Sequence, residues 1–381
     1  MKMMRWLVSM AVWLFVLANP ASASADLTVS ATLQTAGIRV GPLASLLNHV
    51  TNEQLDIRSL LLARNGQVAF EWHSALSSRE HTHQVFSVTK SVVSLLLGQA
   101  VSLQSRFSLQ SDVSSLFDAK PADPRVAQIT LEHLLMMRSG LPKTRAPTPA
   151  FRRLHRAPDR VRHILALHSA RPANTRFQYG NADSQLLAGA VKVISGMDLS
   201  SFAEKTLFGP LGFRHHHWMH ADQKGLVAGG YGLRLRTIDM ARLGQLALQG
   251  GVWNGQQLIP EAYLRRAISA GPDAFYGYQW WTQVSAGDYP SYAALGVRGQ
   301  VIQVVPALKL VFVMTADLPK PQARPVRRTL VNNFVIPAAD GGPEAPGAQQ
   351  AYQRALQRAT GYKPVSAGSQ NLPEAAPANS Q

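Results

Sequence analysis

A serine and a lysine three positions apart, Ser87 and Lys90, form the strongest candidate for a reactive pair in this chain. On a helix, residues at this spacing share one face and lie one turn apart. The run that follows, residues 92–101, is apolar almost all round, which is typical of a helix buried in a large core. Burial disfavours a charged ammonium, so Lys90 can supply the base that the Ser87 hydroxyl needs as a nucleophile. Ser-x-x-Lys occurs once in the sequence, but so short a motif is weak when it stands alone.

The patterns around this pair predict strands near both ends of the chain and helices in its middle. Asn65-Gly66 is the strongest short hairpin signal, and it centres a hairpin over residues 60–72. Further strand patterns occupy residues 276–282, 292–297, 301–305 and 310–316, and helical patterns occupy residues 130–135, 184–194, 237–248 and 326–334. We therefore expect an α+β fold, with an antiparallel sheet completed by both ends of the chain and a helical lobe inserted at about residues 105–270.

The N-terminal segment predicts export. Residues 1–25 combine two cations, Lys2 and Arg5, with an apolar stretch at 6–17 and a small-residue cleavage site at Ala23-Ser24-Ala25. The apolar stretch is too short to span a bilayer comfortably. Because the chain contains no cysteine, we expect a bacterial periplasmic or secreted protein that folds without disulfides.

Composition sets the expected limits of the folded domain. Residues 26–337 have the apolar content of a large domain with one insertion. After residue 337 the composition changes to Ala, Pro, Gly and Gln with few aromatic residues. We expect residues 338–381 to form a disordered tail, apart from a short helix near residues 351–359.

The chain is strongly basic, with a formal net charge of +16, and the excess is concentrated in a basic insert at residues 143–176. One interpretation of the insert is a solvated face. The other is attraction to an anionic envelope surface, which acts on association and localisation rather than on the fold. Nucleic acid is not expected, because no binding module is recognisable. Three adjacent histidines at 215–217, with His220 and Asp222 nearby, lack metal-binding spacing, so we expect neither a metal nor another cofactor.

Seven short strings in a fixed order extend the motif at Ser87: residues 86–91, 130–135 with 139–141, 177–181, 208–213, 229–233 with 239–244, 276–281 and 299–300. Over about residues 60–335 the chain resembles the serine β-lactamase and penicillin-binding protein superfamily. The resemblance is greatest to its class C side, which includes esterases and 6-aminohexanoate-dimer hydrolases. It implies a five-stranded antiparallel sheet flanked by helices, as in β-lactamases and transpeptidases.

The resemblance also implies roles for four residues. Ser87 would attack a carbonyl and form an acyl-enzyme, and Lys90 would take its proton. Tyr179 would relay a proton to the leaving group and later activate water. A phenol is a poor base unless cations lower its pKa, and Lys90 is the expected cation. Asn181 would hold Lys90 or the substrate amide, although an Asn at this position is also typical of a helix cap.

A third element departs from the family pattern. No Lys-x-Gly or His-x-Gly occurs in the chain, and the best match to the strand beside the site is residues 294–300. Gly296 would let the substrate lie close to this strand, and the amide of Val297 would form an oxyanion hole with that of Ser87. The fixed cation that would hold a β-lactam carboxylate is missing. Arg298 is a candidate replacement, although on a strand it would face the other way from Val297.

We therefore expect an exported serine hydrolase that acts on a small ester or amide without a cofactor. Two other enzyme activities remain open, namely those of a β-lactamase and of a D-alanyl-D-alanine carboxypeptidase. A non-catalytic envelope-binding protein on the same scaffold is the alternative outside the enzymes. The set of Ser87, Lys90 and Tyr179 argues against this last possibility, because a binding module has no need of it.

Overall fold

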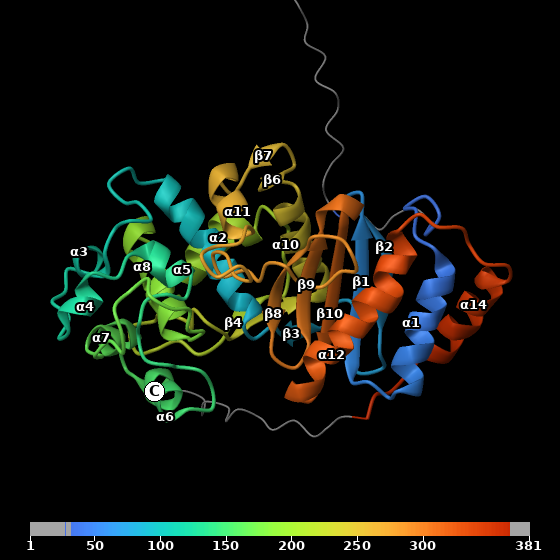
Figure 1. The fold of residues 1–381 in the computed structure, drawn as a ribbon, viewed down its shortest axis with the longest axis horizontal. Helices are drawn as coiled ribbons and strands as arrows, with labels where there is room; N and C mark the ends of the chain where they lie inside the picture. The colour runs from blue at the N-terminus through green and yellow to red at the C-terminus, as the bar shows by residue number, and fades with distance from the viewer. Residues whose placement is uncertain (1–26, 28–31, 366–381) are drawn as a thin grey trace, which may run out of the picture.

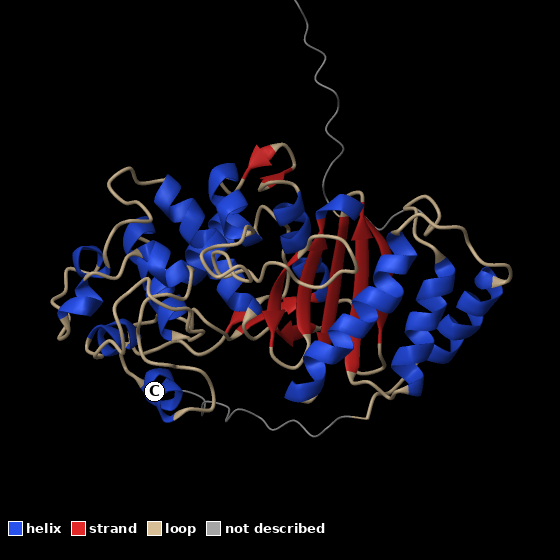
Figure 2. Ribbon diagram, viewed as in Figure 1, coloured by secondary structure: helices blue, strands red, loops and turns tan. Residues whose placement is uncertain are grey.

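A five-stranded antiparallel sheet forms the centre of the protein (Figures 1 and 2). The computed structural model describes residue 27 and residues 32–365. The strand order is β2-β1-β10-β9-β8. The strands are β1 (Ile57–Arg64), β2 (Gln67–His73), β8 (Tyr292–Gly296), β9 (Gln300–Val305) and β10 (Leu310–Ala316). Strands from both ends of the chain meet at the β1–β10 pair, which confirms the predicted α+β fold and its antiparallel sheet.

The turn between β1 and β2 shows why the hairpin forms at Asn65-Gly66. Both residues have positive φ, 54° and 79°, and Arg64 pairs directly with Gln67. A two-residue turn of this hand matches the twist of the strands, and Asn and Gly tolerate positive φ best. The first hairpin is therefore specified locally.

Helices cover both faces of the sheet, so its strands are apolar on both sides. Along β10, Leu310, Phe312 and Met314 belong to one core cluster, whereas Val311 and Val313 belong to the other. The first cluster is shared with α1 (Val40–Asn52), α12 (Lys320–Leu330), α13 (Ile336–Ala339) and α14 (Ala348–Ala359). The second is shared with α2 (Val88–Ser102), α8 (Ala182–Ser195) and α10 (Thr237–Leu248). This strict alternation is what a doubly covered sheet requires.

A lobe made mainly of helices lies between the short strand β3 (Thr82–Gln84) and β8, on the left of Figure 1. Its helical elements besides α8 and α10 are α3 (Val113–Leu116), α4 (Pro124–Ala127), α5 (Leu131–Leu135), α6 (Pro149–Arg156), α7 (Arg160–Leu165), α9 (Leu199–Ala203), a π-helical turn at Glu204–Phe208, and α11 (Glu261–Ala267). Its strands are β4 (His217–Trp218), β5 (Leu233–Arg236), β6 (Val252–Trp253) and β7 (Gln256–Gln257). β3 pairs with β5, which ties the segment before Ser87 to the lobe.

Residues 276–282 do not form the predicted strand. They make bends, with isolated antiparallel bridges from Tyr276 to Trp281 and from Trp281 to Ala293. Gln279 has a φ of 62°, which interrupts extended structure, and its side-chain amide donates to the carbonyls of Leu134 and Leu135. A tertiary anchor therefore overrides the local strand pattern.

The C-terminal region contains the helix expected near residues 351–359, but this helix packs on the body of the protein instead of lying in a disordered tail. α13 and α14 lie within residues 336–359, and Figure 1 shows α14 beside α1. α14 buries Tyr352, Ala355 and Ala359, and the Trp72 indole N–H donates to the Ala359 carbonyl at 3.2 Å. Alanines add little hydrophobicity to a composition, but they let two helices pack closely. The proposed leader, residues 1–25, and residues 366–381 lie outside the described part of the chain.

No single helix among the described residues is both long and apolar enough to cross a membrane. The bent pair formed by α8 and residues 199–208 meets that test by length and composition only.

Candidate active site

Ser87 lies at the N-cap of α2, immediately after a tight turn. Phe86 has a φ of 46°, which is unusual for a residue with a side chain and signals local strain. The Val85 amide donates to Leu233 at 3.0 Å, and the Val88 amide donates back to Val85 at 3.1 Å. The Ser87 side chain makes no capping hydrogen bond to α2. The half-buried Ser87 hydroxyl therefore has no role in capping α2.

Lys90 is buried one helical turn further on, with 1% of its surface exposed. Its ammonium donates to Asn181 Oδ1 at 2.5 Å and to the Gly230 carbonyl at 2.8 Å. A Cβ at Gly230 would lie 2.5 Å from Nζ, so only glycine lets this carbonyl approach. Burial lowers the pKa of Lys90 to about 7, although the charge of Asp183 opposes that shift. Lys90 can therefore accept and release a proton near neutral pH.

Tyr179 joins Ser87 to Lys90, but its electrostatics differ from the prediction. Its phenol is hydrogen-bonded to the Ser87 hydroxyl, and Lys90 Nζ lies 5.3 Å from its ring centroid. Burial raises the pKa of Tyr179 to about 12, against the opposing effects of Ser87 and Arg145. The expected lowering of this pKa by Lys90 is wrong, because desolvation dominates and the cation that opposes it is Arg145. The phenol therefore starts protonated, and Lys90 is the better initial base.

Asn181 occupies the N-cap position of α8, yet its side chain does not cap that helix. Its Oδ1 accepts from Lys90, and its Nδ2 donates to the Thr144 carbonyl at 2.9 Å. Thr144 Oγ1 accepts from the amides of Asn181 and Ala182 instead, each at 2.9 Å. Of the two roles considered from the sequence, holding Lys90 fits these contacts. Thr144 was missed, because nothing in its local sequence links it to a helix that begins at residue 182.

Asp183 is a second residue that the sequence did not reveal. It is buried, hydrogen-bonded by Ser139, and close enough to Lys90 for the two charges to interact. Burial raises the pKa of Asp183 to about 6. Acidic residues are common in the first turn of a helix, so its position alone carried no signal.

Aromatic rings form a wall beside Tyr179. Trp281 stacks on Tyr179 with centroids 5.6 Å apart, and Tyr276 meets it edge-on at 6.1 Å. Phe177 extends the wall to Phe275, whose side chain is 45% exposed. The neighbouring Trp280 is buried in the core. The wall offers an apolar surface for part of a substrate.

The end of β8 lies against the segment that precedes Ser87. A Cβ at Gly296 would lie 2.5 Å from the Val85 carbonyl, so a larger residue would separate them. Val297 follows at the surface. Within the described residues, neither the Ser87 amide nor the Val297 amide donates a hydrogen bond. Both amides remain available to an oxyanion.

Arg298 does not supply the missing cation. It lies in the β8–β9 turn with a φ of 68°, and its guanidinium pairs with Asp317. Asp317 in turn raises the pKa of Arg298. The exposed Arg145 approaches the site instead, with its guanidinium carbon 5.9 Å from the Tyr179 ring centroid. The sequence placed Arg145 in the basic insert, and only the folded chain brings it to the phenol.

One of the three adjacent histidines at 215–217 has a clear structural partner. His216 pairs with Glu204 at 2.9 Å. Elsewhere, His133 caps α5 through reciprocal contacts with Thr130. In the described part of the chain, no group of three or more His, Cys, Asp or Glu side chains is placed to hold a metal ion.

The chain is similar to several known proteins in sequence or in fold. The 6-aminohexanoate-dimer hydrolase of Paenarthrobacter ureafaciens is 24% identical over 162 residues, which is 39% of this chain and only 41% of that protein. A penicillin-binding protein homologue from Caulobacter crescentus has a TM-score of 0.61 at 15% identity, over 76% of this chain and 96% of that one. An octameric penicillin-binding protein homologue from Pyrococcus abyssi has a TM-score of 0.58 at 16% identity, over 85% and 77%.

The family model described as Beta-lactamase matches residues 55–336, which is more than half of the chain. That span contains Ser87, Lys90, Tyr179 and the strands on both sides of the insertion. The chain therefore belongs to the Beta-lactamase family.

Proposed function

We propose that the protein is an exported serine hydrolase that cleaves an ester or amide bond through an acyl-enzyme on Ser87. The observation that carries this proposal is the buried Lys90, with a pKa of about 7, one turn from a serine whose hydroxyl is bonded to Tyr179. Such a pair combines a nucleophile with a base that is neutral at working pH. The signal-peptide pattern at residues 1–25 supports export.

In the acylation step, Ser87 Oγ attacks the carbonyl carbon and its proton passes to Lys90 Nζ. The carbonyl oxygen becomes an oxyanion held by the amides of Ser87 and Val297. When the C–O or C–N bond of the substrate breaks, the Tyr179 phenol gives its proton to the leaving group. This step leaves an ammonium on Lys90 and a phenolate on Tyr179, whose opposite charges stabilise each other.

In the deacylation step, the Tyr179 phenolate takes a proton from water and the resulting hydroxide attacks the acyl carbon. The C–O bond to Ser87 then breaks, and Lys90 returns the proton to Oγ. The products are a carboxylic acid and an alcohol or amine, and all three side chains regain their starting states. The high pKa of Tyr179 is useful here, because its phenolate is a strong base once formed.

Substrate class follows from what surrounds the reacting groups. The aromatic wall of Tyr179, Trp281 and Phe275 suits an apolar acyl or leaving group. Positions 294 and 295 carry Ala and Leu, and Arg298 is paired with Asp317, so β8 provides no cation for a β-lactam carboxylate. We propose small esters and linear amides as substrates. The curated relative, named as a hydrolase of the 6-aminohexanoate dimer, is consistent with a linear amide.

Arg145 is the observation that keeps β-lactamase or D-alanyl-D-alanine carboxypeptidase activity as a second candidate. Its exposed guanidinium lies over the ring of Tyr179, within reach of a carboxylate on a bound substrate. A charged hydrogen bond of this kind contributes about 1.5–3 kcal/mol. If the second candidate holds, Arg145 takes the role of the cation that is missing from β8.

The test begins with intact-protein mass spectrometry after treatment with a fluorophosphonate. We expect one adduct on the wild-type protein and none on Ser87→Ala, whose fold should persist because the hydroxyl caps no helix. p-Nitrophenyl esters and linear amides should then be hydrolysed, with nitrocefin slow or inert. Full turnover by Ser87→Ala would refute the acyl-enzyme.

An Arg145→Gln variant separates the two candidates. If only carboxylate-bearing substrates lose tenfold or more in kcat/KM, the second candidate is favoured for those substrates. If neutral esters and carboxylate substrates change equally, Arg145 is no carboxylate anchor. Arg354→Gln is the matched control for the loss of one surface charge, because the Arg354 side chain is exposed on α14.

A further inference from the structure

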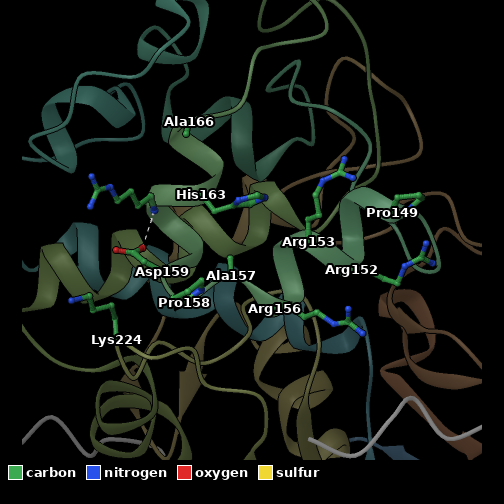
Figure 3. A pocket seen from close by; sticks show the side chains of 11 residues that line it. Pro149, Arg152, Arg153, Arg156, Ala157, Pro158, Asp159, His163, Ala166 and Lys224 are labelled. Atoms are coloured by element: carbon green, nitrogen blue, oxygen red, sulfur yellow. Dashed lines mark hydrogen bonds between the residues drawn. The ribbon is translucent and has the colours of Figure 1, made fainter.

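The basic insert forms a hollow that is separate from the active site. Helices α6 and α7 and the residue Lys224 enclose it, with a volume of about 960 Å³ (Figure 3). Its apolar floor and rim are made of four small or rigid residues: Pro149, Ala157, Pro158 and Ala166. None of the residues assigned to the chemistry of Ser87 lines it.

Five cations surround the hollow, namely Arg152, Arg153, Arg156, Arg162 and Lys224. All five are exposed, and within the described residues none forms an ion pair with a carboxylate. The one carboxylate in the lining is Asp159, which accepts from the Arg162 amide at 2.8 Å and so caps α7. His163 completes the polar lining, and its pKa is lowered by burial and, to a smaller extent, by the charge of Arg153.

The arginines of the insert therefore divide into distinct groups. Arg160 is buried, and its guanidinium donates to the carbonyls of His220 and His155. Arg145 lies at Tyr179. The cations of the hollow form no ion pair with a carboxylate of the described residues, and Arg152 alone among them donates a side-chain hydrogen bond, to the Pro147 carbonyl at 2.8 Å. A protein normally spreads or pairs like charges to limit their repulsion.

The spacing of these cations matches a ligand with repeated charges. Arg152 and Arg156 are one helical turn apart on α6, Arg162 belongs to α7, and all three line the hollow. Neighbouring cations on one helix face lie about 5–6 Å apart at Cβ. Planar guanidinium groups bind phosphate through paired hydrogen bonds. The hollow is far larger than one phosphate, so it suits a chain of them.

We propose that this hollow binds an anionic polymer with recurring phosphate groups and so holds the enzyme on an anionic surface layer. A membrane surface fits less well. The lining contains no aromatic or large aliphatic side chain to insert among lipids, and the cations surround a concave surface rather than a flat one.

The probe is inorganic polyphosphate labelled with a fluorophore, with binding to the full chain followed by anisotropy at several salt concentrations. We expect Arg153→Gln/Arg156→Gln/Arg162→Gln to weaken binding by about tenfold or more, and to reduce the dependence of log Kd on log salt, because fewer counterions are displaced. Ester hydrolysis by this triple variant should equal that of the wild type. Thermal melting checks that it is folded.

The matched control removes three exposed arginines elsewhere, Arg324→Gln/Arg354→Gln/Arg358→Gln on α12 and α14. This variant has the same net charge as the hollow variant and should bind polyphosphate nearly as well as the wild type. Equal loss in both variants would overturn the hollow as a site, because total charge would then explain binding. Absence of wild-type binding at low salt would overturn it as well. Binding to phosphatidylglycerol vesicles that is tighter than to polyphosphate, and lost in the hollow variant, would replace the polymer by a lipid surface.

Discussion

Helices α1 and α2 cover opposite faces of the same sheet, and they bury different kinds of side chain. Every buried residue of α1 is apolar. α2 buries Lys90 and four further polar residues beside its apolar ones, namely Thr89, Ser91, Ser94 and Gln99. The face of α1 and α14 is therefore a conventional hydrophobic core, whereas the face of α2 contains a polar network.

The polar groups of α2 position the site rather than merely occupying the core. Ser91 donates to the Gln279 carbonyl at 2.7 Å, and Ser94 donates to the Tyr278 carbonyl at 2.8 Å. These bonds hold the turn that carries Trp281 against Tyr179. Buried polar groups are costly when unpaired and specific when paired. The difference between the faces thus separates residues that mainly stabilise the protein from residues that mainly arrange its chemistry.

The largest effect should come from Lys90→Met, which tests the face of the sheet that α2 covers. Loss of the proton acceptor should lower kcat/KM by about 10²–10⁴-fold. The melting temperature should change little, because removing a buried amine offsets the loss of its two hydrogen bonds. Steady-state kinetics and calorimetry measure the two quantities. Lys205→Met, at an exposed lysine, is the control, and an equally small kinetic change in both variants would remove Lys90 from the reaction.

Deleting α14 tests the apolar face. A chain that ends at residue 346 would expose Trp72 and the surface of α1. Uncovering two or three large side chains costs about 3–6 kcal/mol, enough to lower the melting temperature by roughly 10 °C or more.

At a temperature where the α14 deletion variant is folded, its kcat/KM should equal that of the full chain, because α14 does not touch Ser87 or Lys90. Tyr352→Ala should reproduce part of the loss, and Gln353→Ala, exposed on the same helix, should not. Unchanged melting would mean that α14 contributes nothing to the fold.

The pH dependence of the reaction tests the coupling of Lys90 to Asp183. Lys90 must be neutral to accept a proton, so kcat/KM should rise with pH through about 7. The charge of Asp183 raises the pKa of Lys90. Asp183→Asn should therefore move the rising limb to lower pH. Profiles measured with a neutral ester avoid titration of the substrate, and a limb that stays in place or moves upward would contradict the coupling.

Of these variants, Arg298→Ala should have the smallest effect. It tests the turn between β8 and β9, at the edge of the sheet. Its partly exposed pair with Asp317 contributes about 0–1 kcal/mol, and we expect ester hydrolysis within about twofold of the wild type. Melting and ester kinetics measure both. Efficient nitrocefin hydrolysis by the wild type that disappears in this variant alone would show that Arg298 binds the carboxylate after all.

Local sequence determined several features of this protein because their physical causes are local. The Asn65-Gly66 turn requires only the φ preferences of two residues, and the apolar run after Ser87 requires only a helical period and a core. The sheet follows from apolar, strand-length runs near both ends of the chain. Ser87, Lys90 and Tyr179 were identifiable because each stands in a motif whose spacing is short.

The remaining features depend on contacts between distant segments. Whether Tyr179 has a raised or a lowered pKa depends on how completely other segments exclude water from it. The docking of α14 depends on the complementary surface of α1, and the anchoring of Gln279 depends on the carbonyls of α5. Arg298 is paired with Asp317 in the β8–β9 turn, whereas Arg145 lies at Tyr179 because the neighbouring Thr144 is bonded to the start of α8. Solvent exclusion and long-range contacts of this kind leave no local pattern in a sequence, so only the tertiary structure decides them.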